Sequence, residues 1–527
     1  MTEVKSPLTT EPHARLALTR RGLLLGAGAL GAGLVGARAR PARAQAGPVR
    51  GGKLTMGLGI GQSTDSLDPA LASSQVPFTA LMTMGERLVD IAPDGSLDLR
   101  LAEKVTPNAD ATVWSFAIRK GVTFHDGSPL GPQDVVRTLE RHAGAQSKSG
   151  AKGILGDVAG LAAEGDSVSV TLKAPNAEFP YLMSDFHLVI QPDGGFADPA
   201  AGIFSGPYRL VEFAPGVRVA MERHAGYWDA AQGHFDQVEI IVINDATARN
   251  AALQAGQVQI VNRLEPKIVD LLSGVPGVQV AATEGRGFYC LNMFCDTAPF
   301  DNADLRMALK LAVNREEMVQ KVLRGYGAVG NDIPVNRAYP LFDDSLPQRA
   351  YDPEQAAFHY RKSGHDAPVV LRAADAAFPG AVDAAMLFQQ SAATAGIPVE
   401  IRREPDDGYW SDVWNKQPFH MSFWAGRPTQ NQMFSTVYLS GAAWNDTRFS
   451  NEGFDKLIVQ ARGELDDGKR KALYAEAALI LRDDGGLIVP MFNQFIDAYR
   501  SDAIQGWESN PNRELMNGLA AVKCWQA

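Results

Sequence analysis

Cysteine is scarce in this chain of 527 residues, which has three, at positions 290, 295 and 524. No two of them have CxxC spacing, and the nine histidines show no paired metal-ligand spacing, so the sequence offers no metal site. Cys290 and Cys295 lie an odd number of positions apart in a strand-like run, which places their side chains on opposite faces. We therefore expect free thiols and no disulfide between them.

The common catalytic signatures are also missing. The chain has no GxSxG elbow, no HExxH motif, no P-loop and no dinucleotide fingerprint. One histidine, His125, stands in a suggestive turn, where bonding to neighbouring backbone explains it better than a catalytic or ligand role. The sequence therefore predicts a protein that is not an enzyme and needs no cofactor.

Long apolar runs are absent beyond one short segment, residues 22–36, which is too short to span a bilayer comfortably. It follows an arginine pair at 20–21 and precedes Ala-Gln-Ala at 44–46, which is the order of an export signal. The arginine pair favours the twin-arginine route, with a general secretory signal as the alternative. No cysteine follows the run, so we expect residues 1–46 to be removed and the mature protein to be soluble in the periplasm.

Basic residues are outnumbered, with 50 Lys and Arg against 60 Asp and Glu. Residues 1–46 hold seven basic and two acidic residues, so 43 and 58 remain after their removal, a net charge of −15. Such a protein is a poor partner for nucleic acid or anionic membranes. The length predicts two or three lobes rather than one core, and we expect a monomer.

The most informative stretch runs from Trp114 to His142. Its first residues alternate apolar and polar, which predicts a half-buried strand. Lys120-Gly121 and Asp126-Gly127 mark turns, and Pro132 is typical of the first turn of a helix.

This stretch resembles the signature of the family 5 extracellular solute-binding proteins, the peptide, opine and nickel receptors of bacterial ABC importers. The matching positions are Arg119, Gly121, Val122, Phe124, His125, Asp126, Gly127, Asp134, Val135 and Val136. Further similar segments are Gly85 to Val89, Pro93-Asp94-Gly95, Leu101-Ala102-Glu103, Gly206-Pro207-Tyr208, Tyr227-Trp228 and Pro299-Phe300-Asp301. The resemblance extends over essentially the whole mature chain.

The resemblance implies an α/β chain with the two-lobed periplasmic-binding-protein fold, class II, with hinge strands and an extra small domain. We expect lobe I from residues 47–84, 197–289 and 494–527, the extra domain from 85–196 and lobe II from 290–493. Strand patterns at 238–242 and 258–260, with a capped helix between them, independently predict a parallel crossover. Residues 288–294 and 485–493 are expected to be hinge strands.

The expected ligand site lies in the cleft between the lobes. Aromatic and polar residues cluster from Ser422 to Thr429, and rings that flank a few polar groups suit an enclosed small-ligand site. The resemblance brings this segment and the loop around Ser66 to the cleft. The candidate ligand-binding residues are Trp424, Arg427, Trp444, Asn445, Asp446, Asp375 and Ser66.

Arg427 is the most specific candidate. Peptide receptors of the family commonly carry an aspartate near this position for the ligand's amine, whereas this chain has an arginine. A guanidinium suits a carboxylate, so we expect Arg427 to grip an anionic group, with Asp446 or Asp375 as a separate amine partner. The alternative is that Arg427 pairs with an acid of its own lobe.

The sequence thus predicts the substrate-binding component of an ABC importer, which delivers a short peptide, opine or similar solute to an inner-membrane permease. A receptor for a metal chelate such as nickel, an exported enzyme and a periplasmic chaperone are the alternatives.

Overall fold

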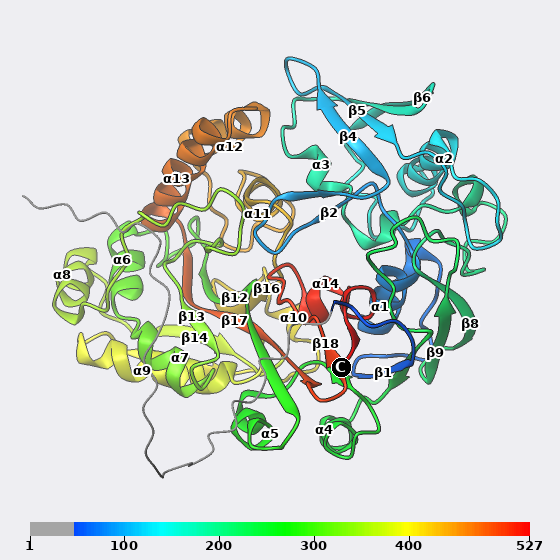
Figure 1. Ribbon diagram of the computed structural model, residues 1–527. Helices are drawn as coiled ribbons and strands as arrows, with labels where there is room; N and C mark the ends of the chain where they lie inside the picture. The colour runs from blue at the N-terminus through cyan, green and yellow to red at the C-terminus, as the bar shows by residue number, and fades with distance from the viewer. Residues whose placement is uncertain (1–46) are drawn as a thin grey trace, which may run out of the picture. The chain divides into compact units, whose positions relative to one another are not determined.

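The structure is a computed structural model that describes residues 47–527 (Figure 1). Residues 48–527 form one compact unit. The expected export signal at 1–46 lies outside the described residues.

An 11-stranded mixed sheet runs through this unit. Its strands, in spatial order, are β15 (Val399–Arg403), β14 (Val369–Ala373), β16 (Phe419–Trp424), β12 (Val278–Met293), β17 (Leu487–Arg500), β11 (Ile260–Val261), β1 (Lys53–Leu58), β10 (Gln237–Val242), β9 (Arg218–Arg223) and β8 (Tyr208–Ala214), and β13 (Gly327–Val329) pairs with β17 off this path.

Two long antiparallel strands, β12 and β17, join the two halves of the sheet. Their register runs from Val278 opposite Arg500 to Asn292 opposite Leu487. Near the first end, Val278 and Ala498 belong to a core with β11, while near the second end Leu291 and Ile488 belong to a core with β14 and β16. Each strand therefore connects two separate hydrophobic interiors. The expected strands at 288–294 and 485–493 are the parts of β12 and β17 nearest the second core.

The first half of the sheet contains the predicted crossover. Strands β10 and β11 both pair parallel with β1, one on each side, and helix α4 (Ala246–Gln254) connects them. Asp245 caps this helix, because its Oδ1 accepts from the Ala248 N–H at 2.7 Å. The hairpin β8–β9 lies beyond β10 and turns at Gly216, whose φ is +72°.

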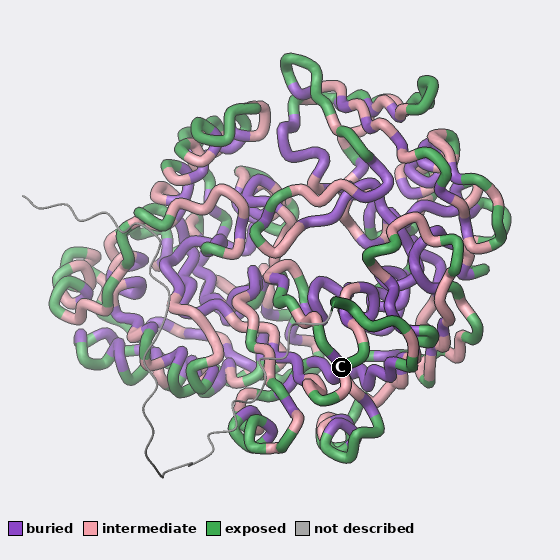
Figure 2. The backbone as a smooth tube through the Cα atoms, viewed as in Figure 1, coloured by how far each residue is buried: buried purple, intermediate pink, exposed green. Residues whose placement is uncertain are grey.

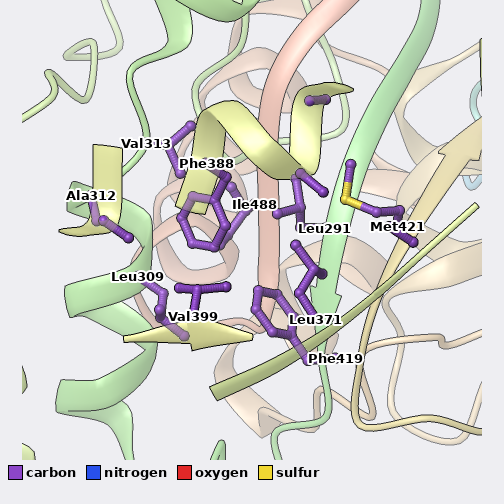
Figure 3. Close-up of a cluster of buried hydrophobic side chains, with 14 of the residues drawn as sticks. Leu291, Leu309, Ala312, Val313, Leu371, Phe388, Val399, Phe419, Met421 and Ile488 are labelled. Atoms are coloured by element: carbon purple, nitrogen blue, oxygen red, sulfur yellow. The ribbon is translucent and has the colours of Figure 1, made fainter. Parts of the chain in front are cut away.

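The second half of the sheet is covered by helices that bury one face each. Figure 3 shows the cluster in which Leu291, Leu371 and Phe419 from three strands meet Leu309 and Phe388 from two helices. The outward faces remain exposed in Figure 2, as on α8, which has one buried residue, Ala356.

A smaller four-stranded sheet holds the stretch on which the family resemblance rests. Its order is β4 (Ala102–Pro107), β5 (Val113–Ile118), β7 (Ser167–Leu172) and β6 (Val158–Glu164). Trp114, Phe116 and Ile118 are buried while their neighbours in β5 are half-buried, which confirms the predicted alternation. Pro132 opens helix α2 (Pro132–Ala143), as expected.

The remaining elements are short strands and helices. The strands are β2 (Val89–Ile91), β3 (Leu97–Leu99), β18 (Ile504–Gln505) and β19 (Trp525–Gln526). The helices are α1 (Gln75–Met84), α3 (Phe179–Leu182), α5 (Val269–Ser273), α6 (Ala303–Leu311), α7 (Arg315–Lys321), α8 (Pro353–Ser363), α9 (Ala381–Thr394), α10 (Tyr409–Asp412), α11 (Gln430–Val437), α12 (Glu452–Gly463), α13 (Asp467–Asp484), α14 (Glu514–Asn517) and α15 (Ala520–Lys523), with 3₁₀ turns at Pro69–Leu71, Phe186–Leu188, Pro192–Gly195 and Pro266–Ile268.

Two further sequence expectations can be checked here. All three cysteines are free, and Cys290 and Cys524 are buried while Cys295 is half-buried. The His125 Nε2 lies 3.1 Å from the Gly206 carbonyl oxygen, and the backbone N–H of His125 donates to the Phe204 carbonyl. Burial lowers the pKa of His125 to about 4. The neighbouring backbone thus explains this histidine.

Candidate functional site

A cavity of about 260 Å³ lies where several distant parts of the chain meet. Helix α1 contributes Phe78 and Met82, and the region of the smaller sheet contributes Ile154 and residues 184–186. Arg286 of β12, residues 426–428, and the C-terminal segment 512–517 complete the wall, together with Gln432 of α11. The cavity therefore combines apolar side chains with polar groups from both halves of the large sheet.

Arg427 lines this cavity, as the sequence argument requires of a ligand-contacting residue. Its Nη1 donates to the carbonyl oxygens of Ala425 and Gly426, at 3.0 and 3.3 Å, and its guanidinium lies 5.7 Å from the Trp424 ring centroid. No described carboxylate forms an ion pair with it, so the expected alternative, pairing with an acid of its own lobe, is absent from the described residues. Burial lowers the pKa of Arg427, and a ligand anion would offset that cost.

Arg286 lies beside Arg427 and holds the backbone of the same segment. Its Nε donates to the Ala338 carbonyl at 2.7 Å, and its Nη1 donates to the carbonyls of Arg427 and Pro428 at 3.3 and 2.9 Å. Its Nη2 is buried and has no hydrogen-bond partner among the described residues. Burial lowers the pKa of Arg286 to about 10, so the group remains a cation at neutral pH. Arg286 therefore positions Arg427 and keeps one donor free.

Arg513 brings a third guanidinium to the cavity from the C-terminal segment. The group packs on two rings, 5.0 Å from the centroid of Phe78 and 5.2 Å from that of Phe186. The side chain is exposed to solvent by its accessible surface. The surrounding protein atoms still lower its pKa by limiting hydration, while the charge of Asp185 opposes this shift. Within residues 47–527 no carboxylate lies within ion-pair distance of Arg513. Three guanidinium groups, each able to bind a carboxylate, therefore line one cavity.

Asp446 does not line the cavity but lies in the protein interior. Its side chain is fully buried, and its Oδ2 accepts from Trp414 Nε1 at 2.9 Å, Trp424 Nε1 at 3.0 Å and Asn292 Nδ2 at 2.8 Å. Burial raises the pKa of Asp446 to about 7. This carboxylate organises the indole rings, and no contact in the structure supports its expected role as an amine partner.

Trp424, Trp444 and Asn445 belong to the same aromatic segment. Trp424 is buried and contacts Arg427 through its ring, whereas Trp444 is half exposed and lies 5.8 Å from the Trp424 ring. Asn445 is buried and bonds the backbone of its own turn, donating to the Phe449 carbonyl at 2.8 Å. Trp424 thus supports Arg427 from behind, and none of the three residues lines the cavity wall.

The remaining candidates, Asp375 and Ser66, also lie outside the cavity wall. Asp375 is exposed, and its Oδ1 accepts from the Val382 N–H at 3.2 Å. Ser66 is half-buried, and its Oγ accepts from the Asp68 N–H at 3.0 Å. Both side chains make local turns, which accounts for their residue types. A ligand-binding role for either remains a prediction.

The sequence argument missed Arg286, Arg513 and Asp185. Arg286 had a partial signal, because it lies two residues before the expected hinge strand at 288–294. Arg513 and Asp185 had none, since each is a polar residue in an irregular segment. Three successive residues, Leu515, Met516 and Asn517, have φ near +60°, a left-handed turn that sequence patterns do not predict.

Other kinds of site find no support in residues 47–527. This part of the chain has no group of three His, Cys, Asp or Glu side chains that could hold a metal ion. Nor does it contain a helix with the length and apolar character that crossing a bilayer requires.

Solved structures with the same architecture define the class of fold. HbpA2 from Haemophilus parasuis superposes with a TM-score of 0.81 at 19% identity, over 90% of this chain and 100% of that one. AgaA from A. tumefacien R10, solved in complex with agropinic acid, gives 0.73 at 21% identity, over 90% and 99%. The chain therefore has the two-lobed fold of the periplasmic binding proteins.

The family follows from sequence comparison. Residues 97–446 match the family model described as bacterial extracellular solute-binding proteins, family 5 Middle. The dipeptide-binding protein of Escherichia coli K12 is 23% identical over 504 residues, which cover 85% of this chain and 91% of that protein. The chain belongs to the family 5 extracellular solute-binding proteins, the substrate-binding components of ABC importers, and is not an enzyme.

Proposed function

We propose that this protein is a periplasmic receptor that captures a small anionic, amino-acid-derived solute, such as a short peptide or an opine, and delivers it to an inner-membrane ABC permease. The observation that carries the proposal is the convergence of Arg286, Arg427 and Arg513 on one cavity without a described carboxylate partner for any of them. Arg286 is buried, Arg427 is half-buried and Arg513 is exposed. A buried guanidinium without a counter-ion is costly, and a ligand carboxylate would remove that cost at Arg286 and reduce it at Arg427. AgaA, a relative of known structure, was solved with agropinic acid, which is consistent with this ligand class.

The size of the cavity supports a small solute. Its volume of about 260 Å³ lies just below the roughly 300–1,000 Å³ of typical small-molecule sites. A long peptide or a macrocycle would need more room. We therefore favour a ligand of the size of an amino-acid conjugate or dipeptide.

The cavity wall also supports the proposed division of the chain. Phe78, Arg286 and Arg513 come from the proposed lobe I of residues 47–84, 197–289 and 494–527. Asp185 comes from the proposed extra domain of 85–196, and Arg427 from the proposed lobe II of 290–493. A ligand in the cavity would contact all three parts, so its binding would favour the closed arrangement through differential contacts.

The experiment is a binding screen of residues 47–527 against dipeptides, opines, amino acids, dicarboxylates and a nickel–histidine chelate, read by thermal shift and then calorimetry. A ligand at a hundredfold excess over its Kd stabilises the folded state by about 2.7 kcal/mol, which is easily detected. We expect shifts with solutes that carry carboxylates, and none with uncharged analogues.

Arg427→Ala is the decisive variant. Loss of a charge-assisted contact predicts an affinity at least about tenfold lower for the best carboxylate ligand. Arg402→Ala is the matched control, because Arg402 lies on β15 with a side chain that is 60% exposed and takes no part in the cavity. Equal affinities of Arg427→Ala and the control would reject an anion site at Arg427.

A further inference from the structure

One carboxylate stands among the three arginines of the cavity. Asp185 lines the wall, and its Oδ1 accepts from the His187 backbone N–H at 3.0 Å and lies 2.5 Å from His187 Nδ1. The other ring nitrogen of His187 lies 3.0 Å from the Ala72 carbonyl oxygen, so the imidazole is held at both ends. No described hydrogen bond reaches Asp185 Oδ2. The carboxylate is therefore fixed in orientation while one oxygen remains free.

A second acceptor of the cavity wall is also unsatisfied. Asn512 Nδ2 donates to the Ile91 carbonyl at 3.3 Å and to Asn510 Oδ1 at 2.7 Å, which orients the amide. Its Oδ1 is buried and has no hydrogen-bond partner among the described residues. A buried acceptor without a donor costs free energy, so a ligand N–H is the natural complement.

Both acceptors lie next to Arg513. Asn512 precedes it in the chain, and Asp185 precedes Phe186, the ring on which the Arg513 guanidinium packs. A donor for carboxylates and two acceptors for N–H groups thus share one end of the cavity. Arg427 and Arg286, from other parts of the chain, line the same cavity and offer further places for an anion.

We propose that Asp185 and Asn512 form an ammonium-binding subsite beside Arg513, so that the cavity selects an α-amino acid whose side chain or conjugate carries a second acidic group. The ligand's α-carboxylate faces Arg513, its α-ammonium faces Asp185 Oδ2 and Asn512 Oδ1, and its second anion faces Arg427. This inference rests on the proposed function, because it assigns the charges of the same ligand. It gives the amine a partner in place of Asp446 and Asp375.

The test compares probes that differ only in the amine. L-Glutamate is paired with glutarate, and γ-L-glutamylglycine with N-glutarylglycine, so each pair keeps both carboxylates. Calorimetry on residues 47–527 should show the amine-bearing member of at least one pair binding about tenfold or more tightly, as expected for a charge-assisted contact. In Asp185→Asn we expect that preference to fall to about threefold or less, with the affinity for the deaminated probe nearly unchanged.

The controls separate this inference from the proposed function. Asp198→Asn replaces an exposed aspartate of the same region and should keep the full preference for the amine. Asn512→Ala, which removes an acceptor without changing charge, should reduce the preference as well, and it serves if Asp185→Asn folds poorly. Dicarboxylate binding with no preference for the amine, or an undiminished preference in both variants, overturns the subsite and leaves the proposed function standing. Failure of all four probes to bind overturns the subsite, and the wider screen then decides the proposed function.

Discussion

At the residue scale, the aromatic segment shows how a buried charge can be used for structure. Asp446 is fully buried and its Oδ2 accepts from two indole N–H groups and one amide. These bonds favour the ionised form, but burial opposes it more strongly and raises the pKa of Asp446 to about 7. The carboxylate therefore fixes the Trp424 ring, which lies 5.7 Å from the Arg427 guanidinium, and the free energy that this costs depends on pH.

The sign of that dependence gives a prediction. The folded pKa of about 7 lies above the ordinary value of 3.8, so the contribution of Asp446 to stability is fully present below about pH 4 and is lost as pH rises through 7. Between pH 5 and pH 8 this loss amounts to about 2–3 kcal/mol. Asp446→Asn cannot titrate, so its free energy of unfolding relative to wild type should improve by that amount from pH 5 to pH 8.

Urea unfolding of both proteins at the two pH values measures this difference. Asp375→Asn is the control, because Asp375 is exposed and the pH dependence of its variant should parallel that of wild type. A constant gap between Asp446→Asn and wild type would mean that Asp446 keeps one protonation state across this range.

Residue chemistry also explains how much of the site the sequence could predict. Arg427 could be predicted from the sequence, because it stands in an aromatic segment where a guanidinium needs an anionic or hydrogen-bonding partner. Arg286 bonds the backbone of Arg427 and Pro428 from a position 141–142 residues away in the chain. Arg513 is also distant in sequence from both of the other arginines. Only the folded chain brings such residues together. The burial of Asp446 could not be predicted either, because burial has no local signal in the sequence, and its role as an amine partner remains a prediction.

At the element scale, local patterns predicted the strands and helices that bury one face. The alternation in β5 and the capped helix α4 were both expected, since each follows from its own residues. Strand β12 begins at Val278, ten residues before the expected start, and this extra part contains Gly285 and Gly287. Pairing with β17 stabilises that part, so a tertiary contact replaced the missing local signal.

The junction of β12 and β17 gives the prediction for this scale. Gly486 directly precedes β17, and a Cβ there would lie 1.9 Å from the Met293 carbonyl oxygen, a backbone atom with little freedom to move. The Met293 N–H also donates to the Gly486 carbonyl at 2.9 Å. Gly486→Ala should therefore lower the free energy of unfolding by about 1–3 kcal/mol or more.

Gly153→Ala is the matched control, since a Cβ at Gly153 meets no atom within 4 Å. Denaturant unfolding should leave this control within about 0.5 kcal/mol of wild type. If both variants unfold alike, the strands at this junction are free to separate, and the close approach of their backbones does not constrain the fold.

At the scale of the whole molecule, the smaller sheet and its neighbours contact helices α12 and α13 through few groups. The Ala177 N–H donates to the Arg462 carbonyl at 2.7 Å, and Arg462 pairs with Asp157.

Glu178 is buried against Arg470, with 3.7 Å between its Oε1 and the arginine Nε. Burial raises the pKa of Glu178, while hydrogen bonds from Thr429 and Tyr474 and the charge of Arg470 lower it. The charge of Glu178 also acts on Arg286, where it opposes the lowering of the pKa by burial. Arg286 lines the cavity, so this contact lies next to it.

This small contact should control how far the cavity stays closed without ligand. Arg470→Met leaves Glu178 buried and unpaired, which is strongly unfavourable, so we expect the contact to separate and the radius of gyration to rise in small-angle X-ray scattering. A bound carboxylate ligand should restore the smaller radius, because it bridges the same parts of the chain.

The control Lys471→Met, one residue further on the same helix and 42% exposed, should leave the radius unchanged. The double variant Glu178→Gln with Arg470→Met removes both charges and should recover part of the closed population. An unchanged radius in Arg470→Met would show instead that the apolar wall, with Phe78 and Phe186, is sufficient to hold the cavity closed.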